Sequence, residues 1–169
     1  MSERDDLLEA LGKQRYFLRY TVQGLTDDQA RLRPTASELC LGGLIKHVAA
    51  TEQRWMEFVL EGPAAMAVPD VNDPDADWSQ WSNLFRLLED ETLDGVLAGY
   101  EKVAARTDEL IRTLPDLDAD QPLPQAPWFP PGARWSARRV ILHLIGETSQ
   151  HAGHADILRE SIDGQKSMG

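Results

Sequence analysis

The sequence predicts an all-α protein, a four-helix bundle in which a long crossover joins the second and third helices. Apolar side chains recur every three or four residues along four long segments, as they do on the buried face of a helix. No segment shows the strict alternation of apolar and polar residues that is typical of a strand. The 169 residues suffice for one domain with a substantial core, so we expect residues 1–169 to form a single domain.

The first helix is predicted over residues 3–23, and Gly24 is expected to end it. Its expected inward side chains are Leu7, Leu8, Leu11, Tyr16, Leu18 and Val22. The sequence TDDQ that follows has the form of a capping box, with Thr26 at the N-cap and Gln29 three residues later. We expect a short helical turn there, which stops before the next proline.

The second helix is predicted over residues 41–62. Its expected inward side chains are Leu44, His47, Val48, Thr51, Trp55, Phe58 and Val59. Residues 62–79 hold three prolines and four aspartates and are predicted to form a long acidic loop, which begins the crossover. Within the crossover, a short helix is indicated by Trp78, Trp81, Leu84, Phe85 and Leu88.

The third helix is predicted over residues 93–114, with Thr92 as its N-cap. Its expected inward side chains are Leu93, Val96, Leu97, Tyr100, Val103, Ala104 and Leu110. Residues 115–135 are rich in proline and aromatic side chains and form a second loop. Ser136 is the predicted N-cap of the last helix, which runs to Ile162.

The charge of the chain argues against several classes of partner. The formal net charge is -11, with 17 basic and 28 acidic residues. Proteins bind nucleic acids largely by neutralising phosphates with basic side chains, so neither nucleic acid nor an anionic membrane is an expected partner. A small molecule or another protein is expected instead.

Other bulk features favour a cytoplasmic protein. No apolar run reaches the roughly 18 residues of a membrane span. The first residues, MSERDDLLEALGKQ, are acidic and amphipathic, unlike a secretory signal. Cys40 is the only cysteine, so no internal disulfide can form, and we expect it to be a small buried apolar residue.

Three of the four histidines lie in the last predicted helix, beside a glutamate. His143, Glu147, His151 and His154 are spaced four, four and three residues apart, so they share one helical face. Glu147 and His151 form an E-x-x-x-H pair whose side chains can converge on one metal ion. Two ligands on one helix rarely hold an ion, and His47, on the apolar stripe of the second helix, is the only other histidine.

An ordinary polar cluster is the alternative to a metal site. A histidine on an apolar stripe is commonly a hydrogen-bonded core residue, and an E-x-x-x-H pair also arises as a surface interaction. Glu147, however, shares its face with Val140, Leu144 and Leu158. A carboxylate on an inward face requires a partner. The pattern alone therefore leaves both alternatives open.

The last helix also carries a resemblance to a known family. The segment RWSARRVILHLIGETSQHAGHADILRESIDG resembles the signature of an actinobacterial branch, of unknown function, within the DinB-like superfamily of four-helix proteins. The resemblance extends over nearly the whole chain. That superfamily holds a divalent metal with one histidine of the second helix and an H-x-x-x-H pair of the fourth, whereas here Glu147 replaces the first histidine of the pair. Mycothiol-dependent maleylpyruvate isomerase, of the same fold, is similar in holding zinc with histidine, glutamate and histidine.

This resemblance implies that His47, Glu147 and His151 bind a divalent metal, with zinc or nickel expected. Three protein ligands would leave open positions for water or substrate. His154, one turn beyond His151, is the candidate catalytic residue as a proton shuttle, and a fourth ligand or a hydrogen-bonding neighbour of a ligand are its alternative roles. His143 is expected to be a neighbour deeper in the bundle.

The resemblance further implies a thiol-dependent S-transferase or isomerase that acts on small electrophiles, because relatives use mycothiol or bacillithiol. Mycothiol is therefore an expected cosubstrate. One alternative is a metal-dependent hydrolase with metal-bound water as its nucleophile. Another is a non-enzymatic, dimeric stress-response or binding module. Homodimers are common among similar proteins, and a homodimer is expected here.

Some other residues are candidates for narrower roles. Asp156 and Arg159 could form a surface pair or help to orient His151 and a substrate. Arg54, about two turns beyond His47, could meet an anionic substrate or simply be solvated. Four aromatic residues could roof a pocket or pack in the core: Trp55, Trp128, Phe129 and Trp135.

Overall fold

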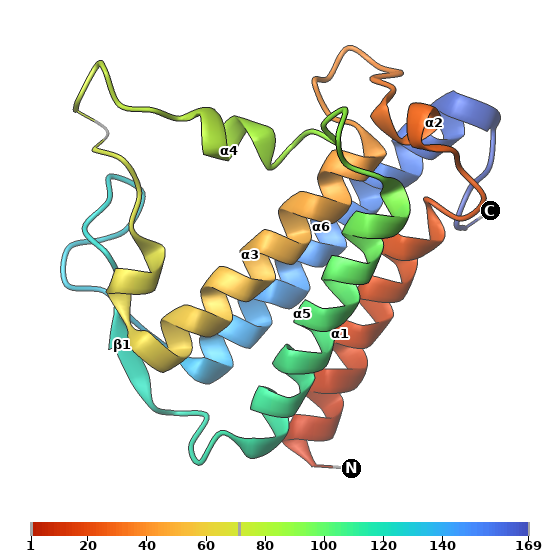
Figure 1. Cartoon of the computed structure of the whole chain (residues 1–169). Helices are drawn as coiled ribbons and strands as arrows, with labels where there is room; N and C mark the ends of the chain where they lie inside the picture. The colour runs from red at the N-terminus through yellow and green to blue at the C-terminus, as the bar shows by residue number, and fades with distance from the viewer. Residues whose placement is uncertain (1, 71, 169) are drawn as a thin grey trace.

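The computed structural model describes residues 2–70 and 72–168, most of which lie in four long helices (Figure 1). These long helices are α1 (Glu3–Tyr20), α3 (Leu41–Glu61), α5 (Leu93–Thr113) and α6 (Ala137–Asp163). The shorter elements are α2 (Asp27–Arg31), the 3-10 helix η1 (Pro63–Met66), α4 (Ser79–Asn83) and the strands β1 (Asp120–Pro122) and β2 (Arg134–Ser136). The predicted all-α, four-helix fold is confirmed.

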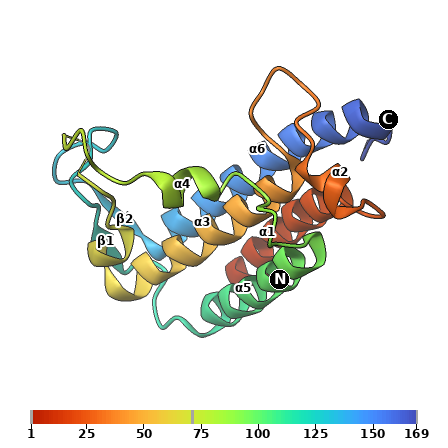
Figure 2. The ribbon, with the colours of Figure 1, turned by 45° about the horizontal axis from the view of Figure 1, so that its top comes forward.

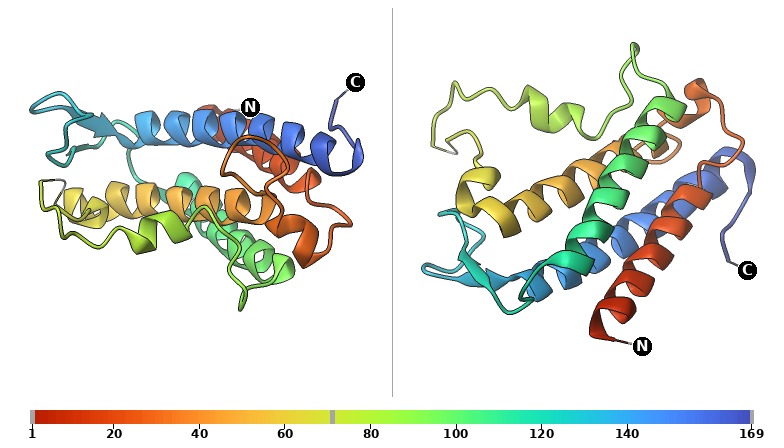
Figure 3. Two further views of the ribbon diagram at one scale, coloured as in Figure 1. Left: turned by 90° about the horizontal axis from the view of Figure 1, so that it is seen from above. Right: turned by 60° about the horizontal axis from the view of Figure 1, so that its bottom comes forward.

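The order of the helices explains the long crossover. Helix α1 packs mainly against α6, and α3 packs against both α5 and α6. Figures 1 and 3 show that α1 and α6 run in one direction and that α3 and α5 run in the opposite one. Because α3 and α5 are parallel neighbours, the chain between them must return along the length of the bundle. Helix α4 lies on this return path beside α3 (Figure 2), as the predicted crossover requires.

Side-chain caps begin the helices at the residues that the sequence predicts. The hydroxyls of Thr26, Thr92 and Ser136 each accept a hydrogen bond from a backbone N–H in the first helical turn. Such a cap typically contributes about 1 kcal/mol. Helix α1 ends at Tyr20, earlier than predicted, because the chain turns before Gly24, whose φ of 73° is in the left-handed region.

The structure contains two short strands that the sequence pattern did not indicate. Strands β1 and β2 pair antiparallel, with Gln121 opposite Trp135. Each strand has three residues, too few for an alternating pattern to be recognised, and Pro122 in β1 weakens the signal further. The pair holds the loop before α6 against α3, where the rings of Trp135 and Trp55 stack with centroids 4.8 Å apart.

The bundle core consists of two apolar clusters with buried polar side chains between them. In this polar layer, Arg15 donates hydrogen bonds to Glu52 at 2.5 Å and to Asp108 at 2.7 Å. Glu52 is 0% exposed and Arg15 is 5% exposed. The prediction that Tyr16 faces inward is wrong, since it is 59% exposed and Arg15 takes the inward position.

The predicted pairing of Asp156 with Arg159 is also wrong. Arg159 is buried and donates hydrogen bonds to the carbonyl oxygens of Thr21 and Gln23, at 2.7 and 2.9 Å. It also forms an ion pair with Asp163. Asp156 instead accepts a hydrogen bond from the backbone of the C-terminal segment. Arg159 therefore ties the end of α6 to the end of α1.

Cys40 is buried beside the start of α3, as predicted for a small apolar residue. Its Sγ lies 3.7 Å from the carbonyl oxygen of Phe85. Among the described helices, none has both the length and the apolar composition needed to cross a bilayer.

Candidate metal centre

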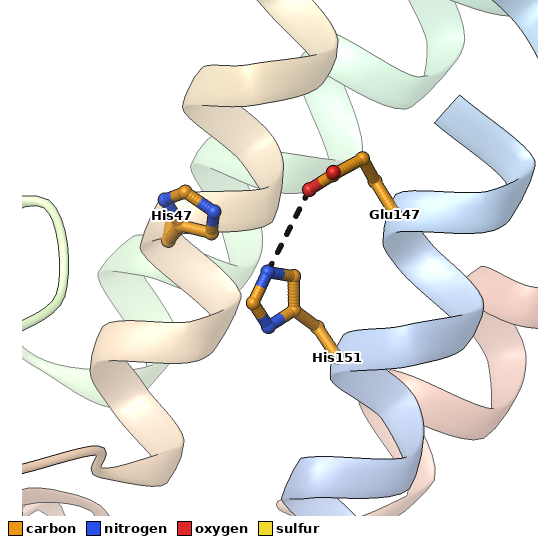
Figure 4. A group of neighbouring side chains, drawn as sticks. All are labelled: His47, Glu147 and His151. Atoms are coloured by element: carbon orange, nitrogen blue, oxygen red, sulfur yellow. Dashed lines mark ion pairs between the residues drawn. The ribbon is translucent and has the colours of Figure 1, made fainter. Parts of the chain in front are cut away.

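The structure brings together three of the four predicted site residues between α3 and α6. His47 projects from α3, and Glu147 and His151 project from α6 toward it (Figure 4). One potential ligand atom from each residue lies within 4.8 Å of the other two. Glu147 and His151 are one helical turn apart, and His151 Nε2 lies 3.7 Å from Glu147 Oε2.

The spacing and chemistry of this group fit a divalent metal ion. Two atoms that bind one ion at about 2.1 Å can be at most about 4.2 Å apart, so side-chain shifts of under about 1 Å bring all three atoms into range. Two imidazole nitrogens and one carboxylate oxygen form a donor set that suits zinc, nickel or iron. The three side chains could therefore hold a metal ion.

His47 lies in a largely enclosed environment. Its ring stacks on Phe85, with centroids 4.0 Å apart, and meets the ring of His151 edge-on at 4.8 Å. Burial, and secondly the proximity of His151, lower the pKa of His47 to about 4. Its Nδ1 is buried and finds no hydrogen-bond partner among the described residues. His47 is therefore neutral at pH 7, which is the form that binds metals.

Two glycines allow the crossover to approach α3 just before His47. A Cβ atom at Gly43 would lie 2.0 Å from the carbonyl oxygen of Phe85, and one at Gly42 would lie 2.8 Å from the side chain of Leu87. Only glycine permits this close approach without movement of the crossover. The contact of Phe85 with His47 was not predicted, and the paired glycines in the first turn of a helix were the only sequence signal for it.

His154 lies beside the three-residue group and outside it. Its Nδ1 is 3.4 Å from Nδ1 of His151, so the two rings can share a hydrogen bond when one of these nitrogens carries a proton. Burial, and secondly His154, lower the pKa of His151. The nitrogen of His151 that faces Glu147 is the other one, Nε2. His154 therefore contacts the nitrogen of His151 that does not face Glu147.

His143 lies on the opposite side of Glu147. Its Nε2 is 3.9 Å from Glu147 Oε1, so the carboxylate is flanked by an imidazole on each side. The His143 ring also packs against Trp55 at 4.9 Å and Trp135 at 5.1 Å. Burial lowers the pKa of His143, although the carboxylate opposes this shift. His143 therefore connects the candidate metal centre to an aromatic cluster.

Comparisons with known proteins bear on the identity of this bundle. A crystal structure of a conserved protein from Enterococcus faecalis has a similar fold, with a TM-score of 0.65. The two sequences are 14% identical, and the match covers 98% of this chain and 99% of the other, so this likeness shows the fold alone. None of the curated proteins compared with the chain matches it. The family model described as mycothiol-S-transferase matches residues 6–164, and the chain therefore belongs to this DinB-like family.

Proposed function

We propose that this protein is a metal-dependent S-transferase that joins a low-molecular-weight thiol, of the mycothiol type, to a small electrophile. The observation that carries the proposal is the convergence of His47, Glu147 and His151 in a chain of the mycothiol-S-transferase family. Three converging protein groups are typical of catalytic zinc sites, which keep a position open, whereas structural zinc sites have four.

The charges of the three side chains suit an anionic sulfur nucleophile. His47 is neutral at pH 7 and burial also favours the neutral form of His151, so Glu147 supplies the only negative charge of the set. A divalent ion held by this set would retain one net positive charge and would favour the thiolate form of a thiol, which is the reactive nucleophile.

The proposed reaction requires a base as well as a nucleophile. The thiol loses its proton, the sulfur forms a bond to the electrophilic carbon, and the leaving group departs with its electron pair. We assign the role of proton acceptor to His154, which is half-buried and contacts His151. Zinc or nickel is the proposed metal, and mycothiol is the proposed cosubstrate.

Metal content and thiol dependence test this function together. We expect the purified wild-type protein to hold about one zinc or nickel ion per chain. The His47→Ala and His151→Ala variants should lose this ion, whereas His154→Ala should keep it and lose activity. Activity is measured as the consumption of a chlorodinitrobenzene electrophile with and without mycothiol. Elemental analysis of the same samples gives the metal content.

Each contrary outcome has a clear meaning. A wild-type protein that binds neither zinc nor nickel would overturn the proposal. Metal-dependent cleavage of esters or amides that is indifferent to added thiol would favour a hydrolase instead. A protein that binds metal but turns over neither class of compound would favour a non-enzymatic binding module.

A further inference from the structure

A pocket of about 380 Å³ lies at the end of α3 that meets the two long connections. Figures 1 and 2 show η1 and the loop between β1 and β2 side by side at this end. The pocket volume is within the roughly 300–1,000 Å³ range of small-molecule sites. The residues that define its chemistry are Arg54, Trp55, Trp81, Gln125, Trp128 and Phe129.

Arg54 supplies the one charged side chain that lines this pocket among the described residues. Most arginines of this chain pair with a carboxylate. Arg54 forms no ion pair within 4.0 Å in the described part of the chain, and its one hydrogen bond goes to a backbone oxygen 3.4 Å away. Burial lowers the pKa of this guanidinium, although nearby Glu57 opposes the shift. Arg54 is thus partly desolvated and its remaining donors are free.

The rest of the pocket wall is suited to a flat, apolar molecule. The guanidinium of Arg54 lies over the Trp81 ring, 4.1 Å from the ring centroid, in a cation–π contact. Trp128 is 59% exposed at the rim of the pocket, and Phe129 packs beside it. Planar guanidinium groups bind carboxylates through two parallel hydrogen bonds, and indole rings stack on planar molecules. An aromatic carboxylate combines both features.

The pocket and the candidate metal centre are close enough to share one ligand. Arg54 follows His47 by seven residues, which is two turns of α3, so both lie on the same helical face about 10 Å apart. Trp55 lines the pocket and packs against His143, whose Nε2 is 3.9 Å from Glu147. A molecule about 10 Å long that is held at Arg54 is therefore long enough to span the distance to the three converging side chains.

We propose that this pocket selects the electrophile, and that it takes a planar, conjugated or aromatic molecule that bears a carboxylate. The carboxylate binds Arg54, the planar body lies between Trp81 and the rim residues Trp128 and Phe129, and the reactive carbon points toward Glu147. The reactive carbon and the carboxylate of the substrate are thus at opposite ends. This inference rests on the proposed transferase function in one respect, namely that the ligand of the pocket is an electrophile.

Binding of 2-naphthoate tests the pocket without any turnover. We expect the metal-free protein, without thiol, to bind 2-naphthoate more tightly than the neutral 2-naphthamide, as measured by calorimetry and quenching of tryptophan fluorescence. Arg54→Gln should weaken naphthoate binding about tenfold or more, because a charged hydrogen-bond partner is lost, and should leave naphthamide binding nearly unchanged. Arg54→Lys should retain part of the preference. Trp81→Leu should weaken the binding of both compounds.

The matched control is Arg86→Gln, which removes an exposed arginine of the same crossover. Arg86→Gln should bind both compounds like the wild type. Equal affinity for naphthoate and naphthamide, or equal losses in Arg54→Gln and Arg86→Gln, would overturn the inference. A wild-type protein that binds neither compound would do the same.

Kinetics of the metal-loaded protein separate this inference from the proposed function. Arg54→Gln should raise KM for a carboxylated chloronitrobenzene with little change in kcat. The same variant should leave unaltered the KM for the chloronitrobenzene that lacks the carboxylate. Naphthoate binding that depends on Arg54, in a protein without thiol-dependent activity, would contradict the proposed function and support the pocket. Thiol-dependent activity that does not change in Arg54→Gln would support the proposed function and contradict the role of the pocket.

Discussion

Burial sets the charge of three histidines at the candidate metal centre. His47, His143 and His151 are each partly withdrawn from solvent between α3 and α6, and burial lowers the pKa of all three. A neutral imidazole offers a lone pair to a metal, whereas a protonated one does not. The same burial that packs the helices therefore prepares the group for a metal ion.

The lowered pKa of His47 predicts how the stability of the metal-free protein depends on pH. The folded pKa is about 4, whereas that of a histidine in the unfolded chain is about 6.5. Between these values the unfolded chain binds more protons, so the free energy of unfolding should fall as the pH is lowered from about 6.5 to about 4. Urea unfolding at several pH values, with a chelator present, measures this fall. His47→Gln should show a shallower decrease, and parallel curves for the two proteins would contradict this expectation.

A second prediction concerns Gly43, where the crossover approaches α3. Gly43→Ala should lower the free energy of unfolding by about 1–3 kcal/mol, because the added Cβ overlaps the backbone oxygen of Phe85. The same change should weaken metal binding, since Phe85 stacks on His47. Chemical denaturation and metal titration measure the two effects.

Gly12→Ala is the matched control for this substitution. Nothing lies within 4 Å of a Cβ atom at Gly12, which is an exposed position inside α1. Alanine favours a helix over glycine by about 0.5–1 kcal/mol, so this variant should be slightly more stable than the wild type. A Gly43→Ala protein as stable as Gly12→Ala would show that the crossover moves away freely.

Three of the four long helices, α1, α3 and α5, are joined near their middle by ion pairs as well as by apolar packing. Arg15 of α1 binds Glu52 of α3 and Asp108 of α5. The hydroxyl of Tyr100, also from α5, is buried in this region without a hydrogen-bond partner in the described ranges. Buried ion pairs cost desolvation, and their removal as a pair is often neutral, so this layer is better explained as a constraint on helix register than as a source of stability.

Removal of one partner of this layer should be strongly destabilising. Glu52→Gln leaves Arg15 buried with a single carboxylate, and we expect a loss of about 3–5 kcal/mol in the free energy of unfolding. The double variant Arg15→Met with Glu52→Leu should recover much of that loss. Glu38→Gln, in the exposed pair with Arg33, should change stability little. Equal losses in Glu52→Gln and the double variant would contradict this account of the layer.

The fourth prediction concerns the coupling of metal binding to the stability of the whole bundle. An ion held by His47 on α3 and by Glu147 and His151 on α6 would bind the folded chain and not the unfolded one. Free zinc at about 100 times its Kd should therefore raise the free energy of unfolding by about 2.7 kcal/mol. Thermal unfolding with and without zinc measures the gain. The His47→Ala protein should show none, and an equal gain in this variant would place the metal elsewhere.

Two expectations about the whole molecule stay predictions. The net charge of -11 opposes binding to nucleic acid, which a gel-shift measurement at moderate salt would check. The expected homodimer would be detected by sedimentation as a species of twice the 18.9 kDa chain mass.

The local pattern of the sequence was sufficient for the helices, their caps and the crossover. A three-to-four residue rhythm specifies a buried helical face, and a hydroxyl at an N-cap specifies where a helix begins, because both depend on residues within one or two turns. The spacing of Glu147 and His151 is equally local. The pattern made His47 a candidate for the same group, and the family resemblance turned this candidate into a prediction.

Only the tertiary structure decided which distant residues meet. The spacing of apolar residues alone predicted that Tyr16 faces inward. Instead Arg15 is buried, because acidic partners on α3 and α5 compensate its charge. The stacking of Phe85 on His47 depends on Gly42 and Gly43, which let the crossover pass close to α3. The local pattern of the sequence does not record the path of the crossover. The sequence by itself thus determined the helices and the residue types of the candidate metal centre. The convergence of these residues, and the pocket at the end of α3, follow from packing between segments that are far apart in the sequence. Contacts between such distant segments produce no periodic pattern in the sequence.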